Sequence, residues 1–130
     1  MRTLPARLFL TLCVAILSGC ASLESNDSET LKAKADSDFA AYIECMKAAT
    51  ANYLTASATA YEIADAAQSK CGAAFHELEN SLQSQLTYGK VTKVGYSAGI
   101  ESAQRLAQDL KISAKEKVVQ WVIESRARGK

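Results

Sequence analysis

The sequence predicts an all-α protein, in which a disulfide clamps an antiparallel helical hairpin and a third, possibly broken, helix follows. Glycine occurs 6 times and proline once in 130 residues, too rarely for an all-β chain that turns roughly every 8–12 residues. Hydrophobic residues make up 48% of the chain and charged residues 22%, as in a globular protein, and the length suits one domain. Apolar residues recur in steps of three and four, which is the period of a helix.

The first helix is expected from about Glu29 to Leu54. Its apolar residues all fall on one helical face, and they are Leu31, Ala35, Phe39, Tyr42, Met46, Ala49 and Tyr53. Residues 20–29 are small and polar, and they predict a flexible tether before a single helical domain over residues 30–130. Alternatively, the helix begins near Asn26, which has capping-box spacing to Glu29.

The second helix is expected from about Ala60 to Leu86, after a break rich in threonine and serine. Thr59 and Glu62 have the spacing of a capping box, which marks the start of this helix. Gly72 would then lie inside the helix, at a cost of roughly 1 kcal/mol relative to alanine. The apolar face is expected to include Ile63, Ala67, Cys71, Leu78 and Leu82.

A third helix is expected over about residues 98–111. Residues 90–97 before it are interpreted as a loop that packs over the helix ends, with an early start of the helix as the alternative. A kink or restart is expected near Ile112, because Ser113 and Glu116 repeat the capping-box spacing. The last helical piece carries the apolar residues Val118, Val119, Trp121, Val122 and Ile123.

The N-terminus has the pattern of a secretory signal peptide over residues 1–19. Arg2 and Arg7 precede a run of ten largely apolar residues, 8–17, whereas a membrane span needs about 20. The alternative is a buried N-terminal helix. The run ends in Leu17, Ser18, Gly19 and Cys20, which resembles the lipobox of bacterial lipoproteins: an aliphatic residue, two small residues and a cysteine.

This resemblance implies that the chain is cleaved before Cys20 and that the cysteine sulfur carries a diacylglycerol. An acyl chain such as palmitate would modify the new amino group. The residue after the cysteine is Ala21 and not the aspartate that retains lipoproteins in the inner membrane. The implied location is therefore the inner leaflet of the outer membrane, facing the periplasm.

Cys45 and Cys71 predict an intramolecular disulfide. Each lies 13 residues from Ala58 in the break, so a hairpin that turns there places them side by side. Helices packed about 8–10 Å apart bring facing Cα atoms within reach of a disulfide, and an oxidising compartment favours the bond. The alternatives are two free thiols, a catalytic dithiol, or a metal site that includes His76.

Residues 60–67 and the following Cys71 also resemble stretches of small, helical, secreted bacterial proteins of uncharacterised activity. This resemblance implies no chemistry.

No pattern in the sequence predicts catalysis. Phosphate-binding glycine loops, zinc-binding His-Glu-x-x-His and nucleophilic Gly-x-Ser-x-Gly motifs are all lacking. Glu77 and Glu79 are two positions apart, as are Asp36 and Asp38, so neither pair shares a helix face. The 15 basic and 14 acidic residues give no overall field that would favour nucleic acid. We expect no catalytic residue, no metal and no cofactor other than the covalent lipid.

The segment 111–130 is the most polarised part of the chain, with six basic residues and two acidic ones. Lys115, Lys117, Trp121 and Arg128 are candidates for contact with an anionic membrane surface or an acidic partner. The alternative is structural, because cations are favoured near a helix C-terminus and Trp121 could cover the core. We expect Trp121 to be partly or wholly buried, with the three cations in solvent.

The expected function is that of a non-enzymatic, periplasm-facing lipoprotein, a small helical interaction or envelope-structural module with a protein partner. One alternative is a small inhibitor, immunity or exclusion-type lipoprotein. Another is a carrier of a small apolar ligand, although an alanine-rich core leaves little room for one.

Overall fold

A computed structural model describes residues 21–129 of the chain, with side chains from residue 26 onward. The elements are α1 (Ala21–Thr50), η1 (Ala51–Tyr53), α2 (Ala60–Lys70), α3 (Gly72–Thr87) and α4 (Lys93–Arg128). All of them are helical, which confirms the all-α class for the described part of the chain. The predicted signal peptide and Cys20 lie outside the described residues.

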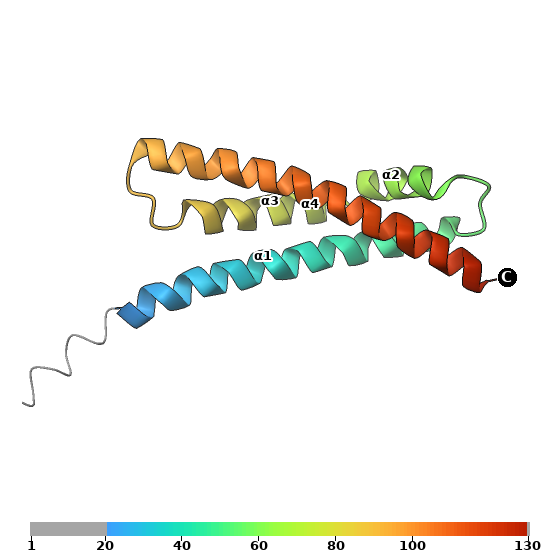
Figure 1. Cartoon of the computed structure of the whole chain (residues 1–130), viewed down its shortest axis with the longest axis horizontal. Coiled ribbons are helices and arrows are strands. Elements are labelled where there is room, and N and C mark those ends of the chain that lie inside the picture. The colour runs from blue at the N-terminus through green and yellow to red at the C-terminus, as the bar shows by residue number, and fades with distance from the viewer. Residues whose placement is uncertain (1–20, 130) are drawn as a thin grey trace, which may run out of the picture.

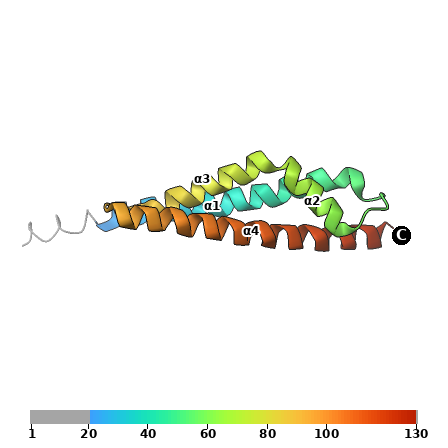
Figure 2. The ribbon, with the colours of Figure 1, turned by 90° about the horizontal axis from the view of Figure 1, so that it is seen from above.

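The helices form an elongated bundle whose length the chain covers three times (Figure 1). α1 runs to the connection at residues 51–59, α2 and α3 run back, and α4 runs forward again from the turn after α3. Seen from above, α4 lies along the other helices for the length of the bundle (Figure 2). Because α4 has 36 residues, it is about 54 Å long, and the two connections lie at opposite ends of this length.

The prediction that residues 21–29 form a flexible tether is wrong. α1 begins at Ala21, so residues 21–29 continue the helix instead of forming a separate flexible segment. These residues contain no glycine or proline, so nothing in them interrupts a helix that the later residues already support. The Thr30 hydroxyl donates to the Asn26 carbonyl oxygen over 2.7 Å, a bond that fits within a continuous helix.

The second predicted helix is two helices. α2 ends at Lys70 and α3 begins at Gly72, with Cys71 between them at φ −97° and ψ 24°. The Cys71 amide still donates to the carbonyl oxygens of Ala67 and Gln68, over 3.0 and 3.2 Å, so the chain bends without losing this bonding. Glycine has the poorest helix propensity of any residue except proline, which accounts for a break at this point.

The start of α4 follows the alternative prediction, because the helix begins at Lys93. The Thr92 side chain accepts a hydrogen bond from the Gly95 amide over 3.1 Å and caps the helix. The prediction that residues 90–97 pack over the helix ends is wrong, since Val91 and Val94 are exposed. Gly89 has φ +70°, a left-handed conformation that favours glycine after a helix end.

The restart predicted near Ile112 is also wrong, because α4 continues without a break to Arg128. Ser113 and Glu116 form no cap. The buried residues of α4 keep one helical face across this region, and this continuous face has no need of a restart; they are Gly99, Ala103, Ala107, Ala114, Val118, Val119 and Val122.

The core lies where α1, α3 and α4 meet, extended by α2 at one end. Its largest fully buried apolar or aromatic side chains are Tyr42, Met46, Leu78, Val118 and Val122. Alanines fill much of the α4 face, and Gly99 brings the helix closest to α3. A Cβ at Gly99 would lie 2.7 Å from the Leu86 carbonyl oxygen, so only glycine fits there without a shift of the backbone.

Candidate partner-binding site

The four predicted contact residues do not form one surface. Lys117 and Trp121 line a cleft between α1 and α4. Lys115 is turned toward α2, where its ammonium group pairs with the Asp65 carboxylate over 2.5 Å. Arg128 is the last residue of α4 and is exposed. Of the three cations, Lys117 and Arg128 are exposed as predicted, whereas Lys115 is partly covered by its partner on α2.

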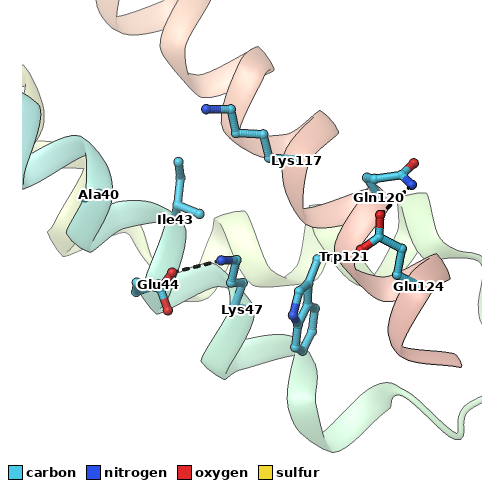
Figure 3. Close-up of a pocket in the computed structure, with 8 residues that line it drawn as sticks. All are labelled: Ala40, Ile43, Glu44, Lys47, Lys117, Gln120, Trp121 and Glu124. Carbon is cyan, nitrogen blue, oxygen red and sulfur yellow. Dashed lines mark hydrogen bonds and ion pairs between the residues drawn. The ribbon is translucent and has the colours of Figure 1, made fainter. Parts of the chain in front are cut away.

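Trp121 is half-buried, which confirms the prediction of partial burial. Its indole lies at the cleft between α1 and α4, close to Lys47 (Figure 3). The cleft has a volume of about 360 Å³, and its lining residues are Ala40, Ile43, Glu44, Lys47, Lys117, Gln120, Trp121 and Glu124. Part of the indole is therefore accessible from outside while the rest packs against the core.

The charges around this cleft balance one another. Lys47 donates to the Glu44 carboxylate over 2.9 Å, and the Gln120 amide donates to the Glu124 carboxylate over 2.8 Å (Figure 3). The Lys117 ammonium lies over the Phe39 ring, 5.4 Å from its centroid. The cleft thus offers an aromatic floor with a polar, nearly neutral rim, which suits an apolar anchor from another protein better than a highly charged ligand.

A second hollow of about 420 Å³ lies on the α2 side of α4, and Lys115 lines it together with Tyr61, Gln68, Gln108, Lys111, Ile112 and Glu116. Besides its bond to Asp65, the Lys115 ammonium lies 5.7 Å from the centroid of the Tyr61 ring. Lys111 lies over the Phe75 ring at 4.9 Å. These lysines hold α2 and α3 against α4, so their role here is structural.

Arg126, one of the six basic residues in segment 111–130, makes contacts that the sequence does not predict. Its guanidinium donates to the carbonyl oxygens of Leu54, Ala56 and Ala58 over 2.8, 2.8 and 2.9 Å. A fourth contact reaches the Tyr53 carbonyl oxygen at 3.5 Å. Arg126 thereby fixes the α1–α2 connection to the end of α4. In the sequence, only the excess of cations in the last helical turns indicated that a basic residue there could bind carbonyl oxygens.

Cys45 and Cys71 lie at disulfide distance, in agreement with the prediction. The sulfur atoms are 2.09 Å apart and the Cα atoms 6.0 Å apart. The bond joins the C-terminal part of α1, five residues before its end, to the bend between α2 and α3, where Cys71 is buried. Because both thiols are used in this bond, neither can act with His76 as a metal ligand.

His76 lies on the surface of α3, with its Nδ1 atom 3.5 Å from the Glu79 carboxylate and its side chain largely exposed. Within residues 21–129 no group of three or more histidine, cysteine or acidic residues is arranged to hold a metal ion. In the same range, no helix is long and apolar enough to cross a membrane.

Among the described residues, four side chains have shifted pKa values, each with a local cause. The Lys34 ammonium donates to the Asp38 carboxylate over 2.8 Å, and this bond raises the pKa of Lys34 and lowers the pKa of Asp38. At the start of α2, bonds from the Thr59 amide and hydroxyl lower the pKa of Glu62. Burial raises the pKa of Tyr42, and the neighbouring Gln68 side chain opposes this rise. Asp38 and Glu62 are held by local bonds, whereas the Tyr42 hydroxyl is buried without a hydrogen-bond partner in the part of the chain that the structure describes.

Comparison with known proteins adds no relative: no family model, no curated protein and no solved structure matches this chain. We therefore infer the function from the residues of the chain itself.

Proposed function

We propose that this chain is a non-enzymatic lipoprotein of the cell envelope that presents a rigid helical bundle to a protein partner. In this proposal, Cys20 carries the lipid and anchors the bundle to the inner leaflet of the outer membrane, facing the periplasm. α1 and the α2–α3 pair act as one disulfide-clamped antiparallel hairpin, and α4 packs on it as the third helix.

The cleft around Trp121 is the observation that carries this proposal. Tryptophan is among the residues that dominate binding energy at protein interfaces, and here it is half accessible between two helices. The walls of the cleft are the packed helices α1 and α4, so the cleft is formed before a partner arrives. A preformed site loses less conformational entropy on binding.

The position of the cleft also supports the proposal. Trp121 lies near the C-terminal end of α4, and α1 begins at the opposite end of the bundle (Figure 1). Ile100, near the start of α4, precedes Trp121 by 21 residues, or about 32 Å of helix. An anchor at Cys20 would hold the cleft well away from the lipid, where a periplasmic protein can reach it.

Site-specific photo-crosslinking in the native cells tests the partner. A photoreactive residue at Gln120, which lines the cleft, should give one discrete protein adduct. The matched control is the same residue at Gln104, which is exposed on α4 but is not part of the cleft. Adding Trp121→Ala to the Gln120 variant should reduce the adduct at least tenfold, while thermal melting verifies that the variant folds.

Equal adducts from Gln120 and Gln104, or an adduct that is insensitive to Trp121→Ala, would contradict the proposed binding cleft. The identity of the captured protein also separates the two forms of the hypothesis. A resident envelope protein supports the structural module, whereas an incoming toxin or transfer machine supports an inhibitor, immunity or exclusion role at the same cleft.

A further inference from the structure

The turn between α3 and α4 presents apolar and basic side chains together. We define the 88–96 turn as the segment from Tyr88 to Tyr96. Val91 is 96% exposed and Val94 is 81% exposed, far more than apolar side chains of a packed bundle require. Lys90 and Lys93 flank Val91, and no acidic residue occurs between Thr87 and Glu101. The 88–96 turn itself therefore carries exposed apolar side chains and two positive charges.

The 88–96 turn lies at the end of the bundle where α1 begins (Figure 1). The Tyr88 hydroxyl donates to the Asp27 carboxylate over 3.4 Å, which places the turn beside the first part of α1. Asp27 follows Ala21 by six residues, or about 9 Å of helix. The turn therefore contacts α1 within about two helical turns of Ala21, the first residue that the structure describes.

We propose that the 88–96 turn is a second membrane contact that binds the surface of an anionic phospholipid bilayer next to the lipid anchor. This inference rests on the proposed lipidation of Cys20. Val91 and Val94 enter the boundary between headgroups and acyl chains, while Lys90 and Lys93 pair with lipid phosphates. A modest tilt of the bundle brings the turn across the remaining distance to the bilayer.

Charge and position favour a bilayer over other occupants. Lys90 and Lys93, beside the exposed valines, match a surface of phosphates, and an anionic membrane attracts lysines within about a Debye length of 8–10 Å. A second copy of the chain would bring the same positive charges together. The two contacts, lipid and turn, would fix the orientation of the bundle, which a single lipid anchor cannot do.

Depth-dependent fluorescence quenching tests this contact on the lipidated protein. The background variant Trp121→Phe removes the natural tryptophan, and Val91→Trp then places a single reporter in the turn. The matched control is Ile123→Trp in the same background, since Ile123 is also exposed but lies 30 residues beyond Lys93, the start of α4, or about 45 Å along that helix. Both proteins are reconstituted on vesicles of phosphatidylethanolamine and phosphatidylglycerol.

Lipids brominated on their acyl chains should quench more than half of the emission from Trp at position 91 and leave that at position 123 almost unchanged. Lys90→Glu combined with Lys93→Glu should reduce the quenching at position 91 at least twofold. If the protein floats with the vesicles but position 91 is not quenched more than position 123, the membrane contact is wrong and the anchor stands.

Two other results overturn the proposal for different reasons. If Cys20 is unmodified by mass spectrometry and the protein does not float with the vesicles, the anchor and the contact that depends on it are both contradicted. If the emission at position 91 is already shifted to the blue without lipid and the protein sediments as a dimer, a second copy of the chain covers the turn.

Discussion

The two ends of the bundle are built differently. At the α1–α2 end, Arg126 ties the connection to α4 through several backbone carbonyl groups, and the Thr59–Glu62 capping box fixes the start of α2. At the α3–α4 end, the connection is short, Val91 and Val94 are exposed, and the Tyr88 hydroxyl donates to the Asp27 carboxylate over 3.4 Å.

The two ends are therefore held in place to different degrees. Long-range hydrogen bonds at the α1–α2 end hold residues 54–58 against the end of α4. Val91 and Val94 at the α3–α4 end contribute little to the packing of the bundle, because they are exposed. We expect the largest losses of stability where a link between helices is removed.

Loss of the disulfide should have the largest effect. The bond closes a loop of 26 residues, and the chain-entropy model assigns such a loop roughly 3.5 kcal/mol at 25 °C. Replacing both Cys45 and Cys71 by alanine should therefore lower the free energy of unfolding by about that amount. Urea titration of the reduced and oxidised wild-type protein provides the matched comparison. Superimposable curves would contradict a stabilising clamp.

Gly99→Ala should destabilise the α3–α4 end. The new Cβ would lie 2.7 Å from the Leu86 carbonyl oxygen, so the helices must separate, at a cost of about 1–3 kcal/mol. Gly72→Ala is the control, because its Cβ would meet no atom within 4 Å; that variant should be neutral or more stable by up to about 1 kcal/mol. Denaturant unfolding measures both. A Gly99→Ala protein as stable as Gly72→Ala would show that the close approach is not required.

Arg126→Ala should loosen the α1–α2 end. It removes charge-assisted hydrogen bonds to three carbonyl oxygens, and because the site is partly exposed we expect a loss of about 1.5 kcal/mol. Hydrogen exchange should accelerate in residues 54–58 and remain unchanged in the 88–96 turn. The neighbouring exposed cation gives the control, Arg128→Ala, which should leave exchange at both ends as it was. Equal acceleration at the two ends would argue against a local clamp.

Thr59→Ala should have the smallest effect, about 1 kcal/mol, because it removes one helix cap. It should also change the acid sensitivity of the protein. The folded-state pKa of Glu62 is lowered, so its contribution to stability is complete above the ordinary carboxyl pKa of about 4.3 and disappears as the pH falls through the lowered value. Thermal melts from pH 6 to pH 2 should therefore show a shallower loss of stability in Thr59→Ala than in the wild type. Parallel curves would remove Glu62 from the explanation.

The features that the sequence predicted correctly depend on local spacing. The Thr59–Glu62 capping box has both of its hydrogen bonds, since a cap involves residues three positions apart. The disulfide depended on one further assumption, that the chain reverses near Ala58. Given that reversal, equal separation along two helices was enough to place Cys45 beside Cys71.

The features that the sequence did not predict depend on tertiary packing. A capping-box spacing at Ser113 predicted a break, but the buried face of α4 continues through it, and core packing outweighs a weak local preference. The contacts of Arg126 span about 70 positions along the sequence, and no local pattern identifies a backbone carbonyl group as a partner. Gly72 indicated a weak point in the second predicted helix. Its poor helix propensity alone does not predict that the chain bends at Cys71 and forms two helices.

We propose that this chain is a lipid-anchored bundle clamped by one disulfide. Intact mass spectrometry of the native protein, purified from membranes without reduction and alkylated after unfolding, tests both parts together. We expect a chain that begins at a lipid-modified Cys20 and gains no alkyl group at Cys45 or Cys71. A chain that begins at Met1, an unmodified Cys20, or two alkylated cysteines at positions 45 and 71 would contradict it.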